Sequence, residues 1–320
     1  MANILVTGGT GFIGSALVKR LAVNPNNHIY VTDNFSRGKN HQASTNITTF
    51  EIDIRDKEKM FRYLFDKRID TIFHLAFVNG TENFYNHPDE VLDVAVKGMQ
   101  TILDFARRCK TKDLILVSSS EIYQESEIIP TLETQSASVP DVFNPRYSYG
   151  GGKLINELMA IHQGSKYFDR VVIVRPHNVY GPAMGNEHVI PQLINKVKEG
   201  FYDSIHGNVH ITMQGDGTQT RSFIYIDDFI DGMMVLYYRG EHLEAYNLGI
   251  QEERKISSVL TEIAEHLGRG IHARKTELPK GGVTRRCPDT FKIRQLGFEP
   301  KISFREGMKR TIDSYMGETK

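Results

Sequence analysis

The chain has 320 residues, of which 40% are hydrophobic and 24% are charged, as in an ordinary globular protein. Lysine and arginine together number 39, as do aspartate and glutamate, and no polybasic run occurs, so nucleic acid and anionic membranes are not expected as partners. The two cysteines are too few for a disulfide framework, the longest apolar runs are strand-sized, and no signal-peptide pattern opens the sequence, so we expect a reducing, cytoplasmic setting.

Short β-rich runs alternate with helix-length segments through the first half of the chain. Strands are predicted at residues 3–8, 28–34, 47–53, 70–76, 113–120 and 170–176. Helices are predicted at residues 12–22, 89–109 and 148–163. Near-continuous apolar strands separated by helices favour a parallel sheet that is buried on both faces. Because its crossovers must be right-handed, the predicted fold is a doubly wound Rossmann-type α/β domain.

The rhythm changes after about residue 180, where glycine and proline punctuate the sequence. Helices follow at 256–267 and 303–316. This pattern predicts a smaller, mixed α/β C-terminal domain that is interleaved with the first. We assign residues 1–178 and about 219–245 to the Rossmann domain, and about 179–218 and 246–320 to the smaller one.

A glycine-rich segment, "TGGTGFIG" at residues 7–14, joins the first predicted strand to the first helix. Gly9, Gly11 and Gly14 satisfy the G-x-G-x-x-G fingerprint, and Gly8 adds a second reading. Glycine allows a tight turn, close approach of backbone to a pyrophosphate, and close helix–strand packing. The N–H groups that begin the helix are then free to bind phosphate. The segment therefore predicts a dinucleotide-binding turn rather than a purely structural one.

An acidic residue follows at the distance that this fingerprint requires. Asp33 lies nineteen residues after the last glycine, at the end of the second strand, where a carboxylate can accept both ribose hydroxyls. It would repel a 2′-phosphate, so NAD is favoured over NADP, although Arg37 and Lys39 lie nearby. Asp53, after the third strand, either reaches the adenine edge or is an ordinary loop aspartate.

A tyrosine and a lysine stand four residues apart in a predicted helix. Tyr149 and Lys153 would share one helix face, so the ammonium can stand near the phenol. A phenol has a pKa near ~10 and is a poor base at neutral pH. A nearby cation and the positive nicotinamide ring would lower that pKa, so that Tyr149 could remove a hydroxyl proton.

Taken together, these motifs resemble the nucleotide-sugar epimerase/dehydratase family of extended short-chain dehydrogenases/reductases. The match covers almost the whole chain in the family's order. The residues that carry it are "TGGTGFIG", Asp33, "FHLA", "SSSEIY", Tyr149 with Lys153, "RPHNVYGP", "GDGTQTRSFIYIDD", "YNLG" and "RRCPDTFKIRQLGFEPKISFREG".

The resemblance implies a bound NAD and a sugar held by its nucleoside diphosphate, with C4 usually oxidised to a ketone. Ser119 would bind the 4-hydroxyl beside Tyr149, with Lys153 completing the set. The implied cofactor-binding residues are Gly8, Gly11, Phe12, Ile13, Asp33, Asn34, Asp53, Ile54, Leu75, Ala76, Tyr149 and Lys153. The implied substrate-binding residues are Thr81, Ser119, Ser120, Asn178, Arg221 and Arg286.

Some of these substrate assignments have alternatives. Asn178, Arg221 and Arg286 match positions where the family binds the diphosphate, and a guanidinium suits phosphate oxygens. The choice of Arg286 over Arg285 depends on spacing alone. Thr81, with its neighbour Glu82, lies in a loop that should pass near the sugar. The twelve histidines show no metal-ligand spacing, so no metal is expected.

The reaction type depends on Glu121. "S-S-E-I-Y" resembles the segment of 4,6-dehydratases and UDP-glucuronate decarboxylases, whereas 4-epimerases usually have a small or neutral residue there. Once C4 is a ketone the C5 proton becomes acidic, and a carboxylate can take it. We therefore expect a dehydratase, a decarboxylase or a C5 epimerase. The alternatives are a 4-epimerase in which Glu121 is structural, for example paired with Arg146, and a non-catalytic NAD-binding sensor.

The sequence departs from the family pattern at several places. Ala95 replaces an asparagine of N-V-x-G-T, His177 replaces an aromatic residue, and "YGGGK" replaces Y-x-x-S-K. The link at residues 197–214 is longer than usual. Glycines inside a helix indicate close approach to a ligand or a partner helix. The predicted helices at 89–109 and 148–163 permit a homodimer, and the nucleotide base and the sugar stay open.

Overall fold

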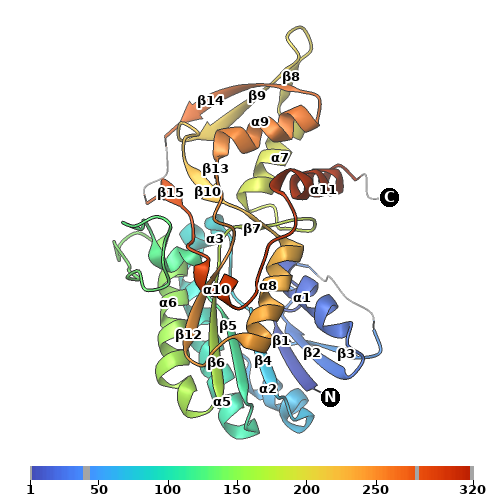
Figure 1. The fold of residues 1–320 in the computed structure, drawn as a ribbon, viewed down its shortest axis with the longest axis vertical. Helices are drawn as coiled ribbons and strands as arrows, with labels where there is room; N and C mark the ends of the chain where they lie inside the picture. The colour runs from blue at the N-terminus through green and yellow to red at the C-terminus, as the bar shows by residue number, and fades with distance from the viewer. Residues whose placement is uncertain (1, 39–43, 278–280, 318–320) are drawn as a thin grey trace.

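The computed structural model describes residues 2–38, 44–277 and 281–317. Seven parallel strands form one twisted sheet in the order β12-β6-β5-β4-β1-β2-β3 (Figure 1). The chain order reverses between β1 and β4, which opens a crevice at the carboxyl ends of these strands. The predicted doubly wound α/β fold is confirmed. The strands are β1 (Ala2–Thr7), β2 (Asn27–Asp33), β3 (Ile47–Glu51), β4 (Thr71–His74), β5 (Asp113–Val117), β6 (Arg170–Pro176) and β12 (Glu244–Leu248).

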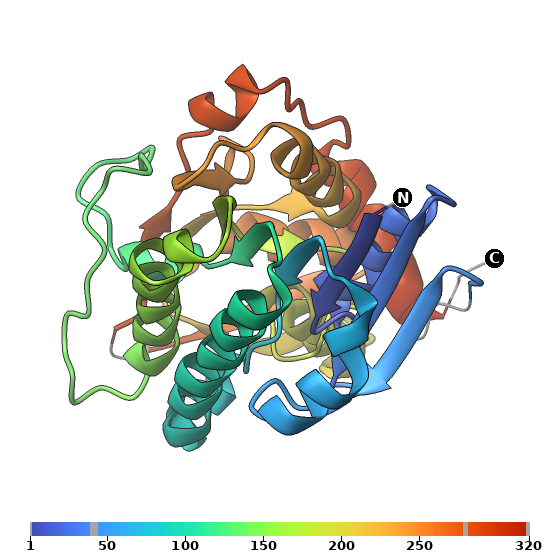
Figure 2. The same ribbon diagram turned by 90° about the horizontal axis from the view of Figure 1, so that it is seen from below.

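Helices cover both faces of the sheet, as the view from below shows (Figure 2). Side chains alternate along each strand, so Ile4 and Val6 enter the core under α1 and α8, whereas Leu5 enters the core under α2, α5 and α6. Burial on both faces explains why the strands read as continuous apolar runs. The helices are α1 (Phe12–Ala22), α2 (Lys57–Leu64), α5 (Met99–Cys109), α6 (Tyr147–His162) and α8 (Ile226–Arg239).

The segment predicted as one helix at 89–109 has three parts. Helix α4 (Pro88–Asp93) passes into a π-helical turn, η2 (Val94–Gly98), before α5 begins. A π-turn inserts extra backbone and re-aims the side chains next to it, and sequence periodicity does not reveal it. A Cβ at Gly98 would lie 2.9 Å from Cγ2 of Ile54, so the chain packs tightly on β3's loop here.

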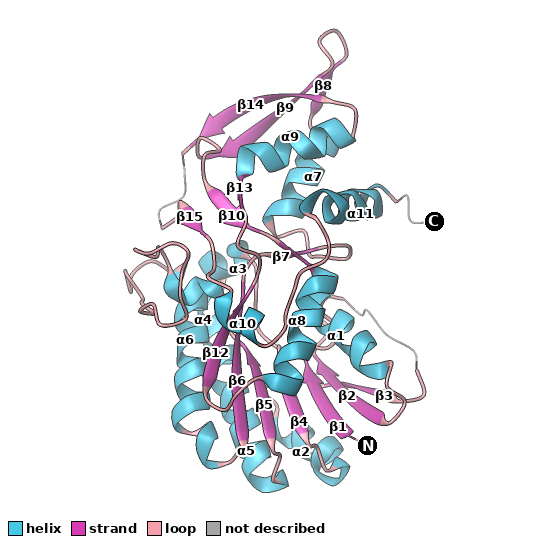
Figure 3. Cartoon of the chain, viewed as in Figure 1, coloured by secondary structure: helices cyan, strands magenta, loops and turns pink. Residues whose placement is uncertain are grey.

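The C-terminal region is a smaller mixed α/β assembly above the sheet (Figure 3). The long link that the sequence singled out forms the antiparallel pair β8–β9, and β9 also pairs in parallel with β14. One core cluster runs from Ile4 of the large sheet to Val209 and Ile263 of this region, so the two parts are packed together.

The remaining elements are α3 (Thr81–Asn86), η3 (Ser120–Tyr123), β7 (Val179–Tyr180), α7 (Val189–Glu199), β8 (Phe201–Asp203), β9 (Asn208–Gln214), β10 (Thr220–Ser222), β11 (Ile224–Tyr225), β13 (Glu253–Lys255), α9 (Ile256–His266), β14 (Gly270–Thr276), β15 (Arg285–Arg286), α10 (Phe291–Gln295) and α11 (Phe304–Met316), with short 3₁₀ turns η1 (Phe65–Lys67) and η4 (Gly164–Lys166).

Three further findings concern membranes, thiols and metals. Within the part of the chain that the structure describes, no helix is long and apolar enough to span a bilayer. Cys109 and Cys287 are both free thiols. The described residues also include no cluster of three or more histidine, cysteine or acidic side chains that could hold a metal ion.

Candidate active site

The glycine-rich turn lies between β1 and α1, at the point where the strand order reverses. Gly8 has φ +69°, and a Cβ there would lie 2.8 Å from the nitrogen of Ala76. A Cβ on Gly14 would lie 2.1 Å from the carbonyl oxygen of Gly8. At Gly11 the nearest protein atom would be 3.4 Å away, so protein packing alone does not require glycine there. No side chain caps α1, whose first N–H groups stay open to a ligand. These features fit the pyrophosphate of a dinucleotide.

Asp33 is held at the end of β2 with its carboxylate fixed. Its Oδ2 accepts from the backbone nitrogen of Thr10 at 3.0 Å, and its Oδ1 accepts from that of Phe35 at 2.9 Å. The remaining lone pairs can accept ribose hydroxyls. Arg37 forms an ion pair with Glu187 instead of extending freely as a phosphate ligand, and Lys39 lies outside the described residues. The site therefore fits NAD.

The predicted residues after β4 and at the start of α1 surround the same crevice. The backbone nitrogens of Leu75 and Ala76 each donate to Oγ1 of Thr7 at 3.2 Å, which ties the loop after β4 to the end of β1. Phe12 and Ile13 are the first two residues of α1 and are half-buried. The structure thus brings both segments next to the glycine turn.

The predicted residues after β3 are more heavily committed to the protein itself. Asp53 binds Arg55 through two bonds of 2.9 and 2.7 Å, and these bonds lower the pKa of Asp53 to about 2. Asn34 lies beside it, with its amide nitrogen 3.4 Å from an Asp53 oxygen. Ile54 is buried against Gly98. Any contact of these residues with the cofactor stays a prediction.

Tyr149 lies in a closed aromatic environment near the start of α6. It is 8% exposed, and Ser119 lies near its hydroxyl and favours the phenolate form, as expected for a pair acting on one hydroxyl group. Phe84 stacks on its ring at 4.5 Å between centroids, and Phe77 meets it edge-on at 5.3 Å. Burial raises the pKa of Tyr149 to about 12, against the opposing effect of Ser119. At neutral pH the phenol is therefore protonated.

Lys153 is buried one helical turn after Tyr149. Its ammonium donates to the carbonyl oxygen of Val117 at 2.8 Å and lies over the Phe77 ring, 4.0 Å from the ring centre. The centre of the Tyr149 ring is 5.9 Å away. Burial lowers the pKa of Lys153 to about 7, and Glu157 partly opposes this shift. The lysine is close to the tyrosine, as its spacing predicted.

Glu121 lies among arginines at the end of β5. One oxygen is 2.5 Å from Nη1 of Arg286, and the other is 3.8 Å from Nη2 of Arg146. Burial alone would raise the pKa of Glu121, but Arg286, Arg146 and Arg221 together lower it to about 2. The carboxylate is therefore ionised at neutral pH. The predicted pairing with Arg146 is present, but the shorter contact is with Arg286, which the resemblance had placed on the diphosphate.

The other predicted phosphate ligands are fixed by backbone groups. Arg221 donates to two carbonyl oxygens at 2.8 Å each, and Asn178, at φ +39°, donates to a third at 2.8 Å. Arg285 instead pairs with Glu253 at 2.6 Å and is exposed, whereas Arg286 is 5% exposed. Of the two neighbouring arginines, Arg286 is the one directed to the predicted site.

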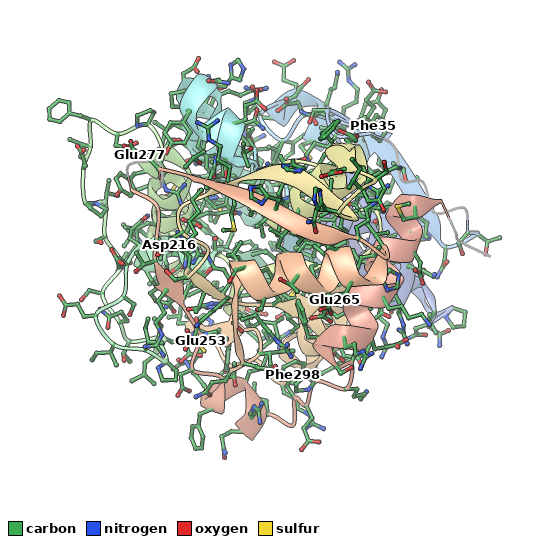
Figure 4. The ribbon with its side chains drawn as sticks, turned by 90° about the horizontal axis from the view of Figure 1, so that it is seen from above. Phe35, Asp216, Glu253, Glu265, Glu277 and Phe298 are labelled. Carbon is green, nitrogen blue, oxygen red and sulfur yellow. The ribbon has the colours of Figure 1, made fainter. Side chains whose placement is uncertain are left out.

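The C-terminal region has a cavity of about 470 Å³, and its lining includes Thr220 and Arg285, which are the sequence neighbours of Arg221 and Arg286. Figure 4 labels Asp216 of its wall and Glu253, the partner of Arg285, on the same side of the molecule. Its lining residues are Gly215, Asp216, Thr218, Gln219, Thr220, Thr284 and Arg285.

The remaining predictions separate into buried and exposed residues. Ser120 is buried at 3% exposure in the turn after β5. Thr81 and Glu82 are exposed, whereas Phe84 of the same short helix contacts Tyr149. Sequence reasoning missed Phe84 and Phe77 as site residues, although both follow β4, whose carboxyl end borders the crevice. It considered Arg146 only as a structural partner of Glu121.

The sequence matches the family described as "NAD dependent epimerase/dehydratase family" over residues 4–249. The chain belongs to this family. The predicted family and the predicted NAD-dependent enzyme class are confirmed.

Known proteins of three activities are similar to this chain. UDP-glucuronic acid decarboxylase 6 of Arabidopsis thaliana is 29% identical over 96% of this chain and 86% of its own length. The structure of UDP-glucose 4-epimerase from Thermotoga maritima, with UDP-glucose, superposes with a TM-score of 0.87 at 27% identity, covering 99% of both chains. A dTDP-glucose 4,6-dehydratase from Streptomyces venezuelae, with NAD bound, gives a TM-score of 0.85 at 26% identity, covering 98% and 97%.

Proposed function

We propose that the protein modifies a nucleotide-diphosphate sugar through a 4-keto intermediate, and that Glu121 and Arg286 control the following step at C5. The observation that carries this proposal is the ionised Glu121–Arg286 pair, which lies two residues from Ser119, the neighbour of the Tyr149 hydroxyl. Ser119 and Tyr149 can bind one sugar hydroxyl, and a charged pair adjacent to them can act on the neighbouring carbon. A simple oxidation and reduction at C4 needs no such pair.

The first step takes place at the C4 hydroxyl. Ser119 orients this hydroxyl and Tyr149 accepts its proton. Bound NAD supplies the oxidant for C4 and, once reduced, the reductant that completes the cycle. Because burial raises the pKa of Tyr149 to about 12, its proton transfer requires the added positive charge of a bound cofactor and of Lys153.

Among the possible C5 reactions, the site supports decarboxylation of a nucleotide-linked uronic acid best. A diphosphate brings two negative charges, which balance the net charge of two that Arg146, Arg221 and Arg286 have beyond Glu121. Arg146 is 3.8 Å from Glu121, and its guanidinium can also bind a carboxylate on C5. Breaking the bond from C5 to the carboxylate moves its electrons into the C4 carbonyl, beside Ser119 and Tyr149. Carbon dioxide leaves, and C5 then takes a proton that the solvent supplies, through a water molecule that we propose the ionised Glu121 orients.

Dehydration is less well supported. Elimination of water from C5 and C6 requires a base at C5 and also a proton donor for the departing hydroxyl. Glu121, with a pKa of about 2, is deprotonated and suits the first role only. The residue before it is Ser120, which is not an acid.

A 4-epimerase is the second candidate. The contact between Glu121 and the buried Arg286 would by itself justify a carboxylate at this position, because a buried guanidinium needs a partner. In that case the pair is structural, and the sugar carries no carboxylate.

The experiment is a substrate panel. The purified protein is incubated with NAD and with uridine, thymidine, guanosine and cytidine diphosphate sugars, each as the neutral sugar and the uronic acid, and products are read by mass spectrometry and NMR. Loss of carbon dioxide from a uronic acid supports the proposal. Loss of water, or isomerisation of a neutral sugar without a mass change, would favour the other reactions.

A matched pair of variants tests the role of Arg146. Arg146→Met should lower kcat/KM for the uronic acid by about 10²-fold, because a charge-assisted bond to the substrate is lost. Arg285→Met removes an exposed arginine that pairs with Glu253 and should change kcat/KM less than about twofold. Equal effects of the two variants would contradict the assignment of Arg146.

We also propose that the protein is a homodimer. Leu92, Val96 and Leu158 lie on α4, η2 and α6 and are 44%, 46% and 43% exposed. Helix α4 packs against α6, so these apolar side chains belong to neighbouring elements. Covering them with a second copy would remove apolar surface from water.

A further inference from the structure

Phe77 lies between the two side chains that the mechanism uses most. Its ring centre is 4.0 Å from the ammonium nitrogen of Lys153 and 5.3 Å from the centre of the Tyr149 ring. The ammonium lies over the ring, and the two aromatic planes are at 89°, an edge-on contact. One side chain from the loop after β4 thus contacts both.

Room for this ring comes from Gly152 of α6, which also faces the small residue Ala95 of η2. A Cβ on Gly152 of α6 would lie 3.1 Å from Cζ of Phe77 and 3.0 Å from Cβ of Ala95 of η2. A serine at 152, which the family has there, would crowd the Phe77 ring and would also meet the Cβ of Ala95, where the family has a larger asparagine. Two departures of this sequence from the family pattern therefore belong to one packing unit, which we name the aromatic shelf: Phe77, Ala95 and Gly152.

The shelf meets a physical need of Lys153. This side chain is 4% exposed, and burying an ammonium is costly unless its charge is compensated. A π face attracts a cation without occupying its N–H bonds as a carboxylate would. The contact to Phe77 therefore stabilises the charged lysine and leaves it able to donate to a hydroxyl group.

We propose that Phe77 is a positioning residue, which keeps Lys153 charged in the buried site and fixes the ring of Tyr149 against Phe84. The inference rests on one part of the proposed function, which is that Tyr149 and Lys153 take part in proton transfer. Charged Lys153 should also favour cofactor binding, because a buried ammonium can donate to cofactor hydroxyls and a neutral amine donates weakly. Cofactor affinity should then fall as the pH rises through the pKa of Lys153.

The test is the pH dependence of NADH binding, followed by fluorescence titration from pH 5 to 9 without substrate. Phe77→Leu keeps an apolar side chain but removes the π face. A cation–π contact in a dry site corresponds to about a five- to tenfold change in an equilibrium constant. The pH at which affinity is half lost should therefore move down by up to about one unit.

Matched variants separate this role from simple packing. Phe84→Leu removes the other aromatic contact of Tyr149 but none to Lys153, so its midpoint should stay at the wild-type pH. Phe77→Tyr keeps the π face and should restore the wild-type midpoint. Gly152→Ala crowds the Phe77 ring and should move the midpoint in the same direction as Phe77→Leu. It therefore provides a second test if Phe77→Leu does not fold.

An unchanged midpoint in Phe77→Leu, or equal movement in Phe84→Leu, would overturn the inference. A purely structural role would lower affinity equally at every pH. Because no sugar is present, the result is independent of the substrate panel. A shifted midpoint without turnover of any nucleotide sugar would preserve the role of Phe77 while the proposed function fails.

Discussion

Replacing Glu121 by glutamine tests the proposed chemistry most directly. The carboxylate contacts Arg286 at 2.5 Å, and its pKa is lowered from 4.5 to about 2. At 1.36 kcal/mol per unit, this depression corresponds to a net preference of about 3 kcal/mol for the ionised form, after the cost of burial has been set against the attraction of the arginines. Glu121→Gln leaves Arg286 buried without its ionic partner, so we expect a loss of roughly 2–4 kcal/mol in the free energy of unfolding.

The same substitution should separate the two chemical steps. Oxidation at C4 uses Ser119 and Tyr149, so bound NADH should still form in Glu121→Gln and its absorbance should persist. The later C5 step should slow by about 10²- to 10⁴-fold, the usual contribution of a positioned acid or base. Stopped-flow absorbance follows the first step, and mass spectrometry follows the second.

A control comes from a nearby carboxylate. Glu125 lies four residues further on and bonds Thr284 at 2.5 Å at the surface, so Glu125→Gln should leave both steps near wild type. Overall turnover of Glu121→Gln within about twofold of wild type would refute the acid–base role. Such turnover together with a lower unfolding free energy would identify the Glu121–Arg286 pair as structural.

Three further outcomes follow from the structure. Gly14→Ala should lower the Tm of the protein measured without cofactor, because its Cβ would lie 2.1 Å from a carbonyl oxygen. Gly11→Ala should keep a Tm near that of the wild type but should bind NADH weakly. If the two variants lowered Tm and NADH affinity equally, this interpretation would be wrong. Burial lowers the pKa of His177 to about 3. Between pH 6.5 and pH 3 the unfolded chain therefore binds a proton that the folded chain does not, so the free energy of unfolding decreases as the pH is lowered through this window. His177→Phe should therefore reduce the difference in Tm between pH 7.5 and pH 5. An unchanged difference would mean that His177 does not contribute to the pH dependence of stability. Leu158→Glu should shift the protein towards a monomer in analytical ultracentrifugation. If the wild-type protein is already a monomer, the proposed homodimer is wrong.

Much of the fold follows from local sequence signals. The apolar strands, the glycine turn and Asp33 are each contained within a short window, and period and spacing locate them. The π-turn at residues 94–98 does not follow from them, because the inserted residue is accommodated by packing on Ile54 from another part of the chain. The division into a cofactor domain and a smaller domain stays a prediction.

The site was predicted less completely, because its main contacts join distant residues. Glu121 and Arg286 are 165 positions apart, and the contact of Phe77 with Lys153 also joins separate elements. Nothing local to either partner indicates such a pair. One usable signal existed in the small residues Gly152 and Ala95, since missing side chains on facing elements indicate that a larger group fills the space between them.

The arginine cluster also bears on why a carboxylate would leave the substrate. Arg146, Arg221 and Arg286 outnumber Glu121 by two charges, which a diphosphate can balance while Glu121 keeps its partner. A uronate carboxylate adds one further negative charge close to an ionised Glu121, where like charges in a partly buried site repel. Loss of carbon dioxide removes that repulsion and returns the cluster to balance, and the electrons left behind pass to the C4 oxygen beside Tyr149. A neutral sugar gains nothing comparable from the cluster, so the difference in kcat/KM between a uronic acid and its neutral counterpart should shrink in Arg146→Met and should persist in Arg285→Met.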